Sequence, residues 1–208
     1  MWDESGAGVI VDPGCYDEGQ LKSLTDFMDR KEARPVAIWL THAHPDHIYG
    51  VAILQELYDI PVFMHPWEDL EASQRMASRF GLEIPRTGFK TVDIHEGDTL
   101  RFGGVEFTVI ETPGHTPGGV CFLDSEDKVL LSGDTLFAGS IGRTDMEGGN
   151  YDALIVSIMN KLMGLDGDID VIPGHGEVTD IGWERTHNPF LQPWGEPDED
   201  YSPEETVS

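Results

Sequence analysis

The chain has 208 residues, 39% hydrophobic and 25% charged, which is enough to bury a sizeable core in one globular domain. Its 13 basic residues face 39 acidic ones, and the formal charge of −26 argues against a nucleic-acid partner or an anionic membrane surface. Two cysteines, no long apolar run and no signal-peptide pattern at the start lead us to expect a cytoplasmic protein.

Short apolar runs bounded by Gly, Pro or Asp predict buried strands in several parts of the chain. These runs lie at residues 9–11, 36–40, 61–64, 105–110, 120–123, 129–131 and 169–172. Apolar residues with helical spacing, or dense apolar stretches, predict helices at 21–28, 48–58, 70–80 and 151–162. The order begins β-α-β-α-β-α, has a strand-rich middle and closes α-β-α, which predicts sheets with helices packed outside.

The C-terminal segment 195–208 differs in composition from the rest of the chain. It has six acidic residues, no basic ones and three Gly or Pro residues. This composition predicts a disordered acidic tail after a single domain at 1–194, and an interaction segment is the alternative interpretation.

The segment Thr41-His-Ala-His-Pro-Asp-His47 follows the buried-looking run 36–40 directly. Three of the eight histidines fall in it, beside a carboxylate and at a strand end, where α/β proteins place their sites. In an extended loop residues two apart point the same way, so His42 and His44 can hold one metal ion. Asp46 and His47 can turn toward a second ion.

Three later loops each place one potential ligand among glycines, shortly after a predicted strand. They carry His115 in Thr-Pro-Gly-His-Thr-Pro-Gly-Gly, Asp134 in Ser-Gly-Asp-Thr, and His175 in Pro-Gly-His-Gly. Glycines let the backbone turn sharply, so that one side chain projects into a shared space. Together with residues 42–47, these loops predict a metal centre.

In these motifs the sequence resembles the metallo-β-lactamase-fold hydrolases, and among them the small glyoxalase II-like (hydroxyacylglutathione hydrolase-like) branch. The resemblance runs from about Val9 to Leu191 and implies an α+β fold, a four-layer αββα sandwich with a dinuclear site at the rim of its sheets. It implies that His42, His44 and His115 bind the first metal, that Asp46, His47 and His175 bind the second, and that Asp134 bridges both.

The implied reaction is hydrolysis of a thioester in a small-molecule substrate. Imidazole and carboxylate ligands suit two divalent ions, zinc first, with iron or manganese as alternatives. Such ions turn bound water into a hydroxide nucleophile and polarise a carbonyl. Asp46 is expected to act in catalysis as well, by orienting the hydroxide or passing a proton to the leaving group.

Three further residues have weaker claims to a role in the site. Arg143 lies in Gly-Arg-Thr-Asp beyond the predicted bridging aspartate, and it is expected either to orient substrate as a catalytic residue or to form an ion pair with Asp145. Asp12, in Val-Asp-Pro-Gly, either accepts a hydrogen bond from a metal-binding histidine or shapes a turn. His65 is expected at the surface or in a capping role, with substrate contact as the alternative.

The sequence departs from the family pattern at both ends. Family members usually carry a pair of strands before the run at 9–11, and only eight residues precede it here. If those strands are missing, a partner or oligomerisation is expected to cover the exposed sheet edge. The helical substrate domain of full-length glyoxalase II has no counterpart in the 33 residues after His175, which puts glutathione recognition in doubt.

Other activities share the predicted metal site. The segment Gly142-Arg-Thr-Asp145 also resembles persulfide dioxygenases, for which the family implies one iron held by two histidines and an aspartate. A lactone or ester hydrolase is a further alternative. Antibiotic-hydrolysing relatives commonly carry cysteine where this chain has Asp134, which argues against β-lactamase activity. A scaffold protein would not be expected to keep seven ligands.

Overall fold

The computed structural model describes residues 1–79, 81–84 and 88–192. Its strands are β1 (Ala7–Val11), β2 (Arg34–Trp39), β3 (Val62–Met64), β4 (Thr91–Asp93), β5 (Thr99–Phe102), β6 (Val105–Glu111), β7 (Val120–Asp124), β8 (Val129–Gly133), β9 (Leu136–Phe137), β10 (Ser140–Ile141), β11 (Asp170–Pro173) and β12 (Thr179–Asp180). Its helices are α1 (Glu18–Arg30), α2 (Pro45–Ile48), α3 (Val51–Tyr58), α4 (Leu70–Arg79), α5 (Tyr151–Ser157) with the π-helical turn η1 (Ile158–Leu162), and α6 (Ile181–His187).

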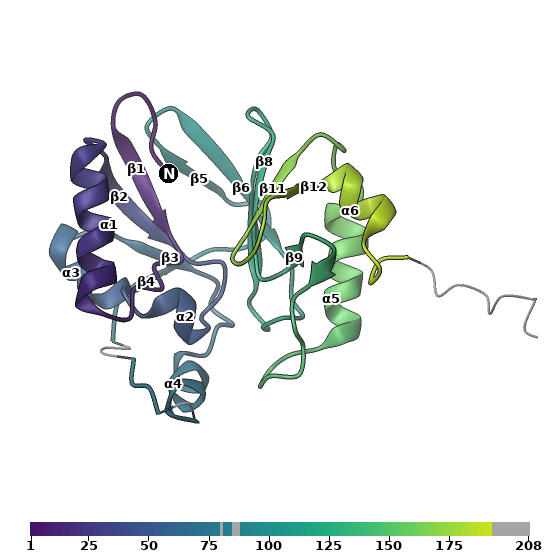
Figure 1. The fold of residues 1–208 in the computed structure, drawn as a ribbon, viewed down its shortest axis with the longest axis horizontal. Coiled ribbons are helices and arrows are strands. Elements are labelled where there is room, and N and C mark those ends of the chain that lie inside the picture. The colour runs from purple at the N-terminus through teal and green to yellow at the C-terminus, as the bar shows by residue number, and fades with distance from the viewer. Residues whose placement is uncertain (80, 85–87, 193–208) are drawn as a thin grey trace, which may run out of the picture.

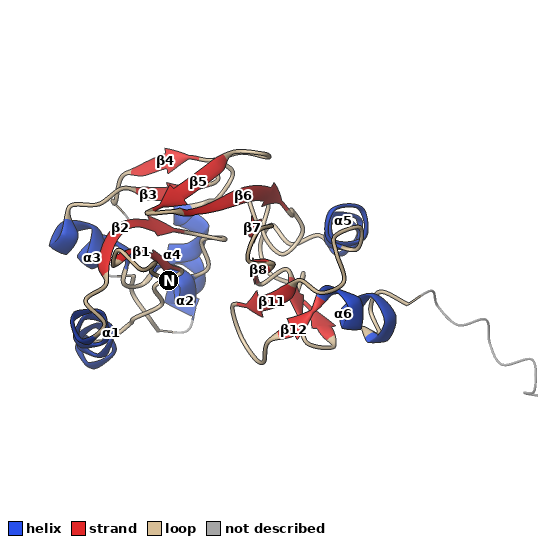
Figure 2. Ribbon diagram, turned by 90° about the horizontal axis from the view of Figure 1, so that it is seen from above, coloured by secondary structure: helices blue, strands red, loops and turns tan. Residues whose placement is uncertain are grey.

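The elements form four layers in the order helices, sheet, sheet, helices (Figure 1). A parallel sheet with the order β1-β2-β3-β4 lies under α1 and α3, and a mixed sheet with the order β12-β11-β8-β7-β6-β5 lies under α5 and α6. Figure 2 shows the two halves from above, with α1 and α3 on the outer side of one half and α5 and α6 on the outer side of the other. The α+β class and the αββα sandwich expected from the sequence are confirmed.

The core divides into three apolar clusters because successive strand residues face opposite sides of a sheet. In β2, Ile38 packs against α1 and α3, while Ala37 and Trp39 face the other sheet. In β7, Phe122 joins the cluster between the sheets, and Cys121 joins the cluster under α5. The inter-sheet cluster therefore fixes how the two halves of the molecule sit against each other.

Each predicted strand is present, but one predicted helix is divided. The stretch 48–58 contains the end of α2, then Tyr49 and Gly50, and then α3. The Gly50 N–H donates to the carbonyl of Pro13 at 2.8 Å, so this turn is tied to the loop after β1 instead of continuing the helix. Phe80, the last residue of the predicted helix 70–80, and the predicted tail 195–208 lie outside the described residues.

The strand ends bring the predicted ligand loops to one rim of the sandwich. Residues 41–47 follow β2 and residues 112–119 follow β6. Asp134 comes directly after β8 and His175 shortly after β11, which pairs with β8 in parallel. At the edge of the other sheet, β1 adds an antiparallel bridge from Trp2 to Gly8. Within the described part of the chain, no helix has the length and apolar character needed to cross a bilayer.

Candidate metal centre

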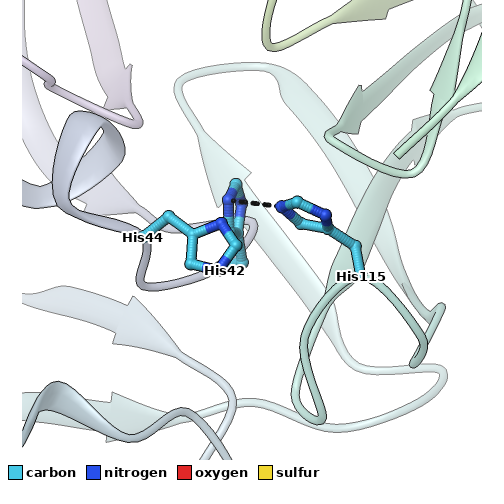
Figure 3. Close-up of side chains that lie close together, drawn as sticks. All are labelled: His42, His44 and His115. Carbon is cyan, nitrogen blue, oxygen red and sulfur yellow. Dashed lines mark hydrogen bonds between the residues drawn. The ribbon is translucent and has the colours of Figure 1, made fainter. Parts of the chain in front are cut away.

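Three buried histidines from the two halves of the sandwich meet at this rim. His42 and His44 lie in the loop after β2, and His115 reaches toward them from the loop after β6 (Figure 3). The Nε2 atoms of His42 and His115 are 3.3 Å apart, and the three residues each offer a ligand atom within 4.8 Å of the others. This set is called the three-histidine cluster below.

A second set lies beside it, with one buried member and two exposed members. Asp46, His47 and His175 offer ligand atoms within 4.8 Å of one another. Nε2 of His175 is 3.2 Å from Nε2 of His47 and 3.1 Å from Oδ2 of Asp46. The side chains of Asp46 and His175 are 60% and 54% exposed, so this outer cluster is the side from which a substrate can approach.

Asp134 lies between the two clusters. Its Oδ1 is 3.5 Å from Nε2 of His47, and its Oδ2 is 3.6 Å from Nε2 of His115 and 3.7 Å from Nε2 of His175. One carboxylate thus faces ligand atoms of both sets. The structure brings together all seven residues for which the sequence predicted metal binding.

The residues present fit a pair of metal ions. Among the described residues, His44 Nε2 and Asp134 Oδ1 are buried polar atoms without a hydrogen-bond partner, which is costly unless something else binds them. Two ligands about 2.1 Å from one tetrahedral ion lie about 3.4 Å apart, close to the spacing of the ring nitrogens here. Five imidazoles and two carboxylates suit zinc, iron or manganese.

Hydrogen bonds fix the protons of three imidazoles away from the centre. Thr41 Oγ1 donates to Asp12 Oδ2 at 2.6 Å, so it accepts from Nδ1 of His42 at 3.0 Å. Nδ1 of His47 donates to the same Asp12 oxygen at 3.0 Å, and Nδ1 of His115 donates to the carbonyl of Arg143 at 2.7 Å. Each Nε2 is left facing the centre with a lone pair when the ring is neutral.

The two clusters differ in their electrostatics. Burial lowers the pKa of His42 far below its ordinary range, lowers that of His44 to about 3, and lowers that of His115 as well. Burial also acts to lower the pKa of His47, but the Asp12 hydrogen bond and the nearby carboxylates outweigh it and raise the pKa to about 9. The three-histidine cluster is therefore neutral at pH 7, whereas His47 without a metal is charged.

Asp12 and Arg143 each accept a hydrogen bond from a histidine of the centre, Asp12 with its side-chain carboxylate and Arg143 with its backbone carbonyl. Asp12 is the hydrogen-bond partner of a predicted ligand, one of the two alternatives that the sequence left open. The Arg143 guanidinium is 61% exposed and donates to Asp145 at 2.7 and 2.8 Å, which is the ion-pair alternative. What holds His115 is the backbone carbonyl of Arg143, and a catalytic role for the side chain stays a prediction.

His65, directly after β3, is buried and only 3% exposed, which corrects the expectation of a surface position. Its Nδ1 accepts from the N–H of Trp67 at 3.2 Å, which places the proton on Nε2, 3.0 Å from Glu111. His65, His95 and Glu111 form a further group of potential metal ligands, but this hydrogen bonding satisfies the buried imidazole without an ion. Sequence reasoning missed Glu111 because it lies within an ordinary strand pattern.

A cavity of about 410 Å³ opens beside the outer cluster. Asp12, Asp46, His47 and His175 line its polar end. Its remaining walls are largely apolar and come from β1, α1 and β11, including Val9, Leu24, Phe27 and Ile172. A small molecule with an apolar part fits this combination of walls.

Comparison with known proteins identifies the family. The family model of the Metallo-beta-lactamase superfamily matches residues 2–175 of this chain. The chain is 36% identical over 199 residues to hydroxyacylglutathione hydrolase GloC of Haemophilus influenzae, covering 92% of this chain and 90% of GloC. It is 38% identical over 188 residues to the probable metallo-hydrolase YqgX of Bacillus subtilis, covering 88% and 86% of the two chains.

Solved structures agree with this relationship. The B3 metallo-beta-lactamase BLEG-1 superposes with a TM-score of 0.82 at 38% identity, over 93% of this chain and 92% of its own. TTHA1623 in a di-iron-bound form gives 0.78 at 40% identity, over 88% and 89%. ETHE1 from Myxococcus xanthus gives 0.74 at 27% identity, over 91% and 76%. The chain therefore belongs to the metallo-beta-lactamase superfamily, whose members are generally metal-dependent hydrolases with a dinuclear metal site.

Proposed function

We propose that the protein is a metal-dependent hydrolase that cleaves a small-molecule thioester. The observation that carries the proposal is the pair of complete ligand clusters with Asp134 between them. His42, His44 and His115 would hold one divalent ion, Asp46, His47 and His175 the other, and Asp134 both. A centre with two ions and an exposed side is typical of hydrolytic catalysis.

Two bound divalent ions supply an acidified water molecule and polarisation of the substrate carbonyl. The chain's own contribution is proton handling and positioning. The half-exposed Asp46 carboxylate can take a proton from attacking water and return it to the leaving thiolate, because it faces both the centre and solvent. Hydrogen bonds from His42, His47 and His115 to fixed acceptors hold these rings in one orientation.

The similarity to GloC supports a thioester as the substrate class. The cavity beside the outer cluster supports a substrate with an apolar acyl part. Zinc is the proposed metal, with iron or manganese as alternatives, and TTHA1623 shows that a protein 40% identical to this chain binds two irons. A cytoplasmic location remains part of the proposal, together with a small-molecule partner and oligomer formation.

Persulfide oxidation at a single iron is the second candidate. The similarity to ETHE1, together with the segment Gly142-Arg-Thr-Asp145, favours it. Lactone and ester hydrolysis remain alternatives at the same centre. The 38% identity to BLEG-1 also weakens the sequence-based argument against β-lactamase activity, so a β-lactam belongs among the test substrates.

The first experiment is metal analysis by plasma mass spectrometry on protein purified without added metal or a metal-binding tag. Two ions per chain, followed by hydrolysis of acyl-glutathione or other acyl thioesters, would support the proposal. One iron per chain and oxygen uptake with glutathione persulfide would replace it with the dioxygenase. Turnover of a β-lactam or a lactone, with thioesters left intact, would reject the proposed substrate class.

A further inference from the structure

Ala43, between His42 and His44, has both of its backbone polar groups hydrogen-bonded to side chains in or just before α4. The N–H of Ala43 donates to Oε2 of Glu68 at 2.7 Å. The carbonyl of Ala43 accepts a hydrogen bond from the hydroxyl of Ser73. Because Ala43 lies between two members of the three-histidine cluster, these bonds hold the backbone from which both imidazoles project.

The second oxygen of the same carboxylate reaches the loop that carries His115. Glu68 Oε1 accepts from the N–H of Gly118 at 3.0 Å. The packing here is close, since a Cβ on Gly118 would lie 2.9 Å from the Glu68 nitrogen and 2.9 Å from Nδ1 of His65. Glu68 thus joins the two loops that supply the cluster, although 25 and 50 residues separate it from its partners.

The turn that presents Glu68 is itself anchored. The Glu68 N–H donates to the carbonyl of His65 at 3.1 Å, and His65 donates from Nε2 to Glu111 at 3.0 Å. Glu111 ends β6, just before the loop of His115. The backbone and the carboxylate of Glu68 are therefore both held by hydrogen bonds, so the carboxylate is suited to positioning the two loops.

We propose that Glu68 is a positioning residue that sets the metal affinity of the three-histidine cluster by clamping the loops of His42, His44 and His115 together. The inference rests on the metal centre of the proposed function. A carboxylate is needed because two peptide N–H groups require an acceptor at each oxygen. Glutamine offers one acceptor only, and its NH₂ group would face an N–H donor.

The test compares Glu68→Gln with Glu71→Gln, which removes an exposed carboxylate from the same segment. Each protein is loaded with Co²⁺ and dialysed against graded chelator, and bound metal is measured by plasma mass spectrometry. We expect Glu68→Gln to lower the affinity for one of the two metal ions by about 10- to 100-fold, the usual effect of losing a group that orients metal ligands. Glu71→Gln should leave the affinity for both ions unchanged.

Paramagnetically shifted proton signals of the Co²⁺ protein identify the weakened ion. The Nδ1 protons of His42 and His115 report on the three-histidine cluster, and His175→Ala provides the spectrum of a centre without an intact outer cluster. Loss of the His42 and His115 signals first in Glu68→Gln supports the inference. Wild-type affinity at both ions, or weakening confined to the outer cluster, overturns it.

Ser73→Ala keeps the inference testable if Glu68→Gln does not fold. It removes the hydrogen bond to the Ala43 carbonyl and should lower the affinity for the same metal ion, by less than Glu68→Gln does. An unchanged affinity in Ser73→Ala would then count against the clamp. Because the readout is metal binding, absence of thioester hydrolysis would reject the proposed function alone, while unaltered binding in the variants would reject only the role of Glu68.

Discussion

At the candidate metal centre, some side chains are potential ligands and others form the hydrogen bonds that orient those ligands. His47 illustrates this division, because Asp12 fixes its ring on one side while its Nε2 faces His175 and Asp134 on the other. The ordering of its proton by a carboxylate raises its basicity. The outer cluster therefore depends on Asp12 as well as on its own three residues.

His47→Ala separates the two candidate functions. The substitution removes one member of the outer cluster and leaves Asp12 without that partner. A dinuclear hydrolase should no longer bind its second ion, and its turnover should fall by at least about 100-fold, because water activation depends on that ion. A single-iron dioxygenase should retain its metal and most of its oxygen uptake. Metal analysis and the two activity assays, run side by side, distinguish these results.

The histidines also predict how the metal-free protein responds to pH. His42 and His44, whose pKa values are lowered by burial, bind fewer protons folded than unfolded below pH 6.5, so stability falls as the pH drops from 6.5 toward 5.5. His47 has a pKa raised to about 9, so its stabilising contribution is complete below 6.5 and is lost as the pH rises toward 9. The chelated protein should therefore have its highest Tm near pH 6.5.

Thermal melts of chelated protein from pH 5.5 to 9 test this expectation. Asp12→Asn serves as the control, because it removes the carboxylate that keeps His47 protonated. The decline in Tm above pH 6.5 should be shallower in this variant. A Tm that keeps rising between pH 6.5 and 9 in the unsubstituted chain would contradict the assignment of a charged His47.

At the scale of elements, strand ends and helix starts position the ligands. The loop after β6 carries His115 and packs directly on α5. In this loop, Gly114 has φ +143°. A Cβ at Gly114 would lie 2.3 Å from the nitrogen and Cα of Leu154. Glycine is required here both for the backbone conformation and for the close approach of loop and helix.

Gly114→Ala is expected to lower the free energy of unfolding by about 3 kcal/mol, the sum of backbone strain and overpacking. It should also weaken metal binding, because the displaced loop carries His115. Gly97→Ala is the matched control, since Gly97 has φ +80° and open space where its Cβ would be. It should cost about 1 kcal/mol and leave metal affinity unchanged. Equal losses in the two variants, measured by chemical denaturation, would show that contact with α5 is unimportant.

At the scale of the whole molecule, the centre exists only because two sheets are held face to face. Trp39 of β2 is 1% exposed and lies between the sheets, with its ring 5.5 Å from that of Phe107 and 5.4 Å from that of Phe122. Three residues farther along the chain comes His42, whereas His115 and Asp134 belong to the opposite half. The packing between the sheets therefore sets how the potential metal ligands of the two halves lie relative to one another, and we expect it to affect metal binding.

Trp39→Ala is expected to cost about 3–5 kcal/mol of stability, because it leaves a large cavity between the sheets. Metal affinity should fall as well, although Trp39 is not a ligand. Trp183→Ala changes a 54% exposed tryptophan that stacks on His187, and it should leave both properties nearly unchanged. Denaturation curves combined with metal titration check the coupling, and full metal affinity in a destabilised Trp39→Ala protein would disprove it.

The sequence by itself determined the strands that form the sandwich and the ligand types, because both depend on residues close together in the chain. Short apolar runs, as in β2 and β7, indicate buried strands, and the close spacing of His42, His44, Asp46 and His47 supplies members of both ligand clusters from one short segment. The αββα fold came from the family resemblance, which the structure confirms. The division of the 48–58 helix was missed, because the bond from Gly50 to Pro13 is not visible in local periodicity.

Only the tertiary structure decided which other groups serve the centre. The chain has 39 acidic residues, and nothing in its local pattern marks Glu68 as the partner of Ala43 and Gly118, or Glu111 as the partner of a buried His65. For Asp12, the structure shows the hydrogen bond to a histidine of the centre, which was one of the two alternatives that the sequence left open. The physical reason is that these bonds join segments brought together by strand order and sheet packing, whereas sequence patterns describe only neighbours along the chain.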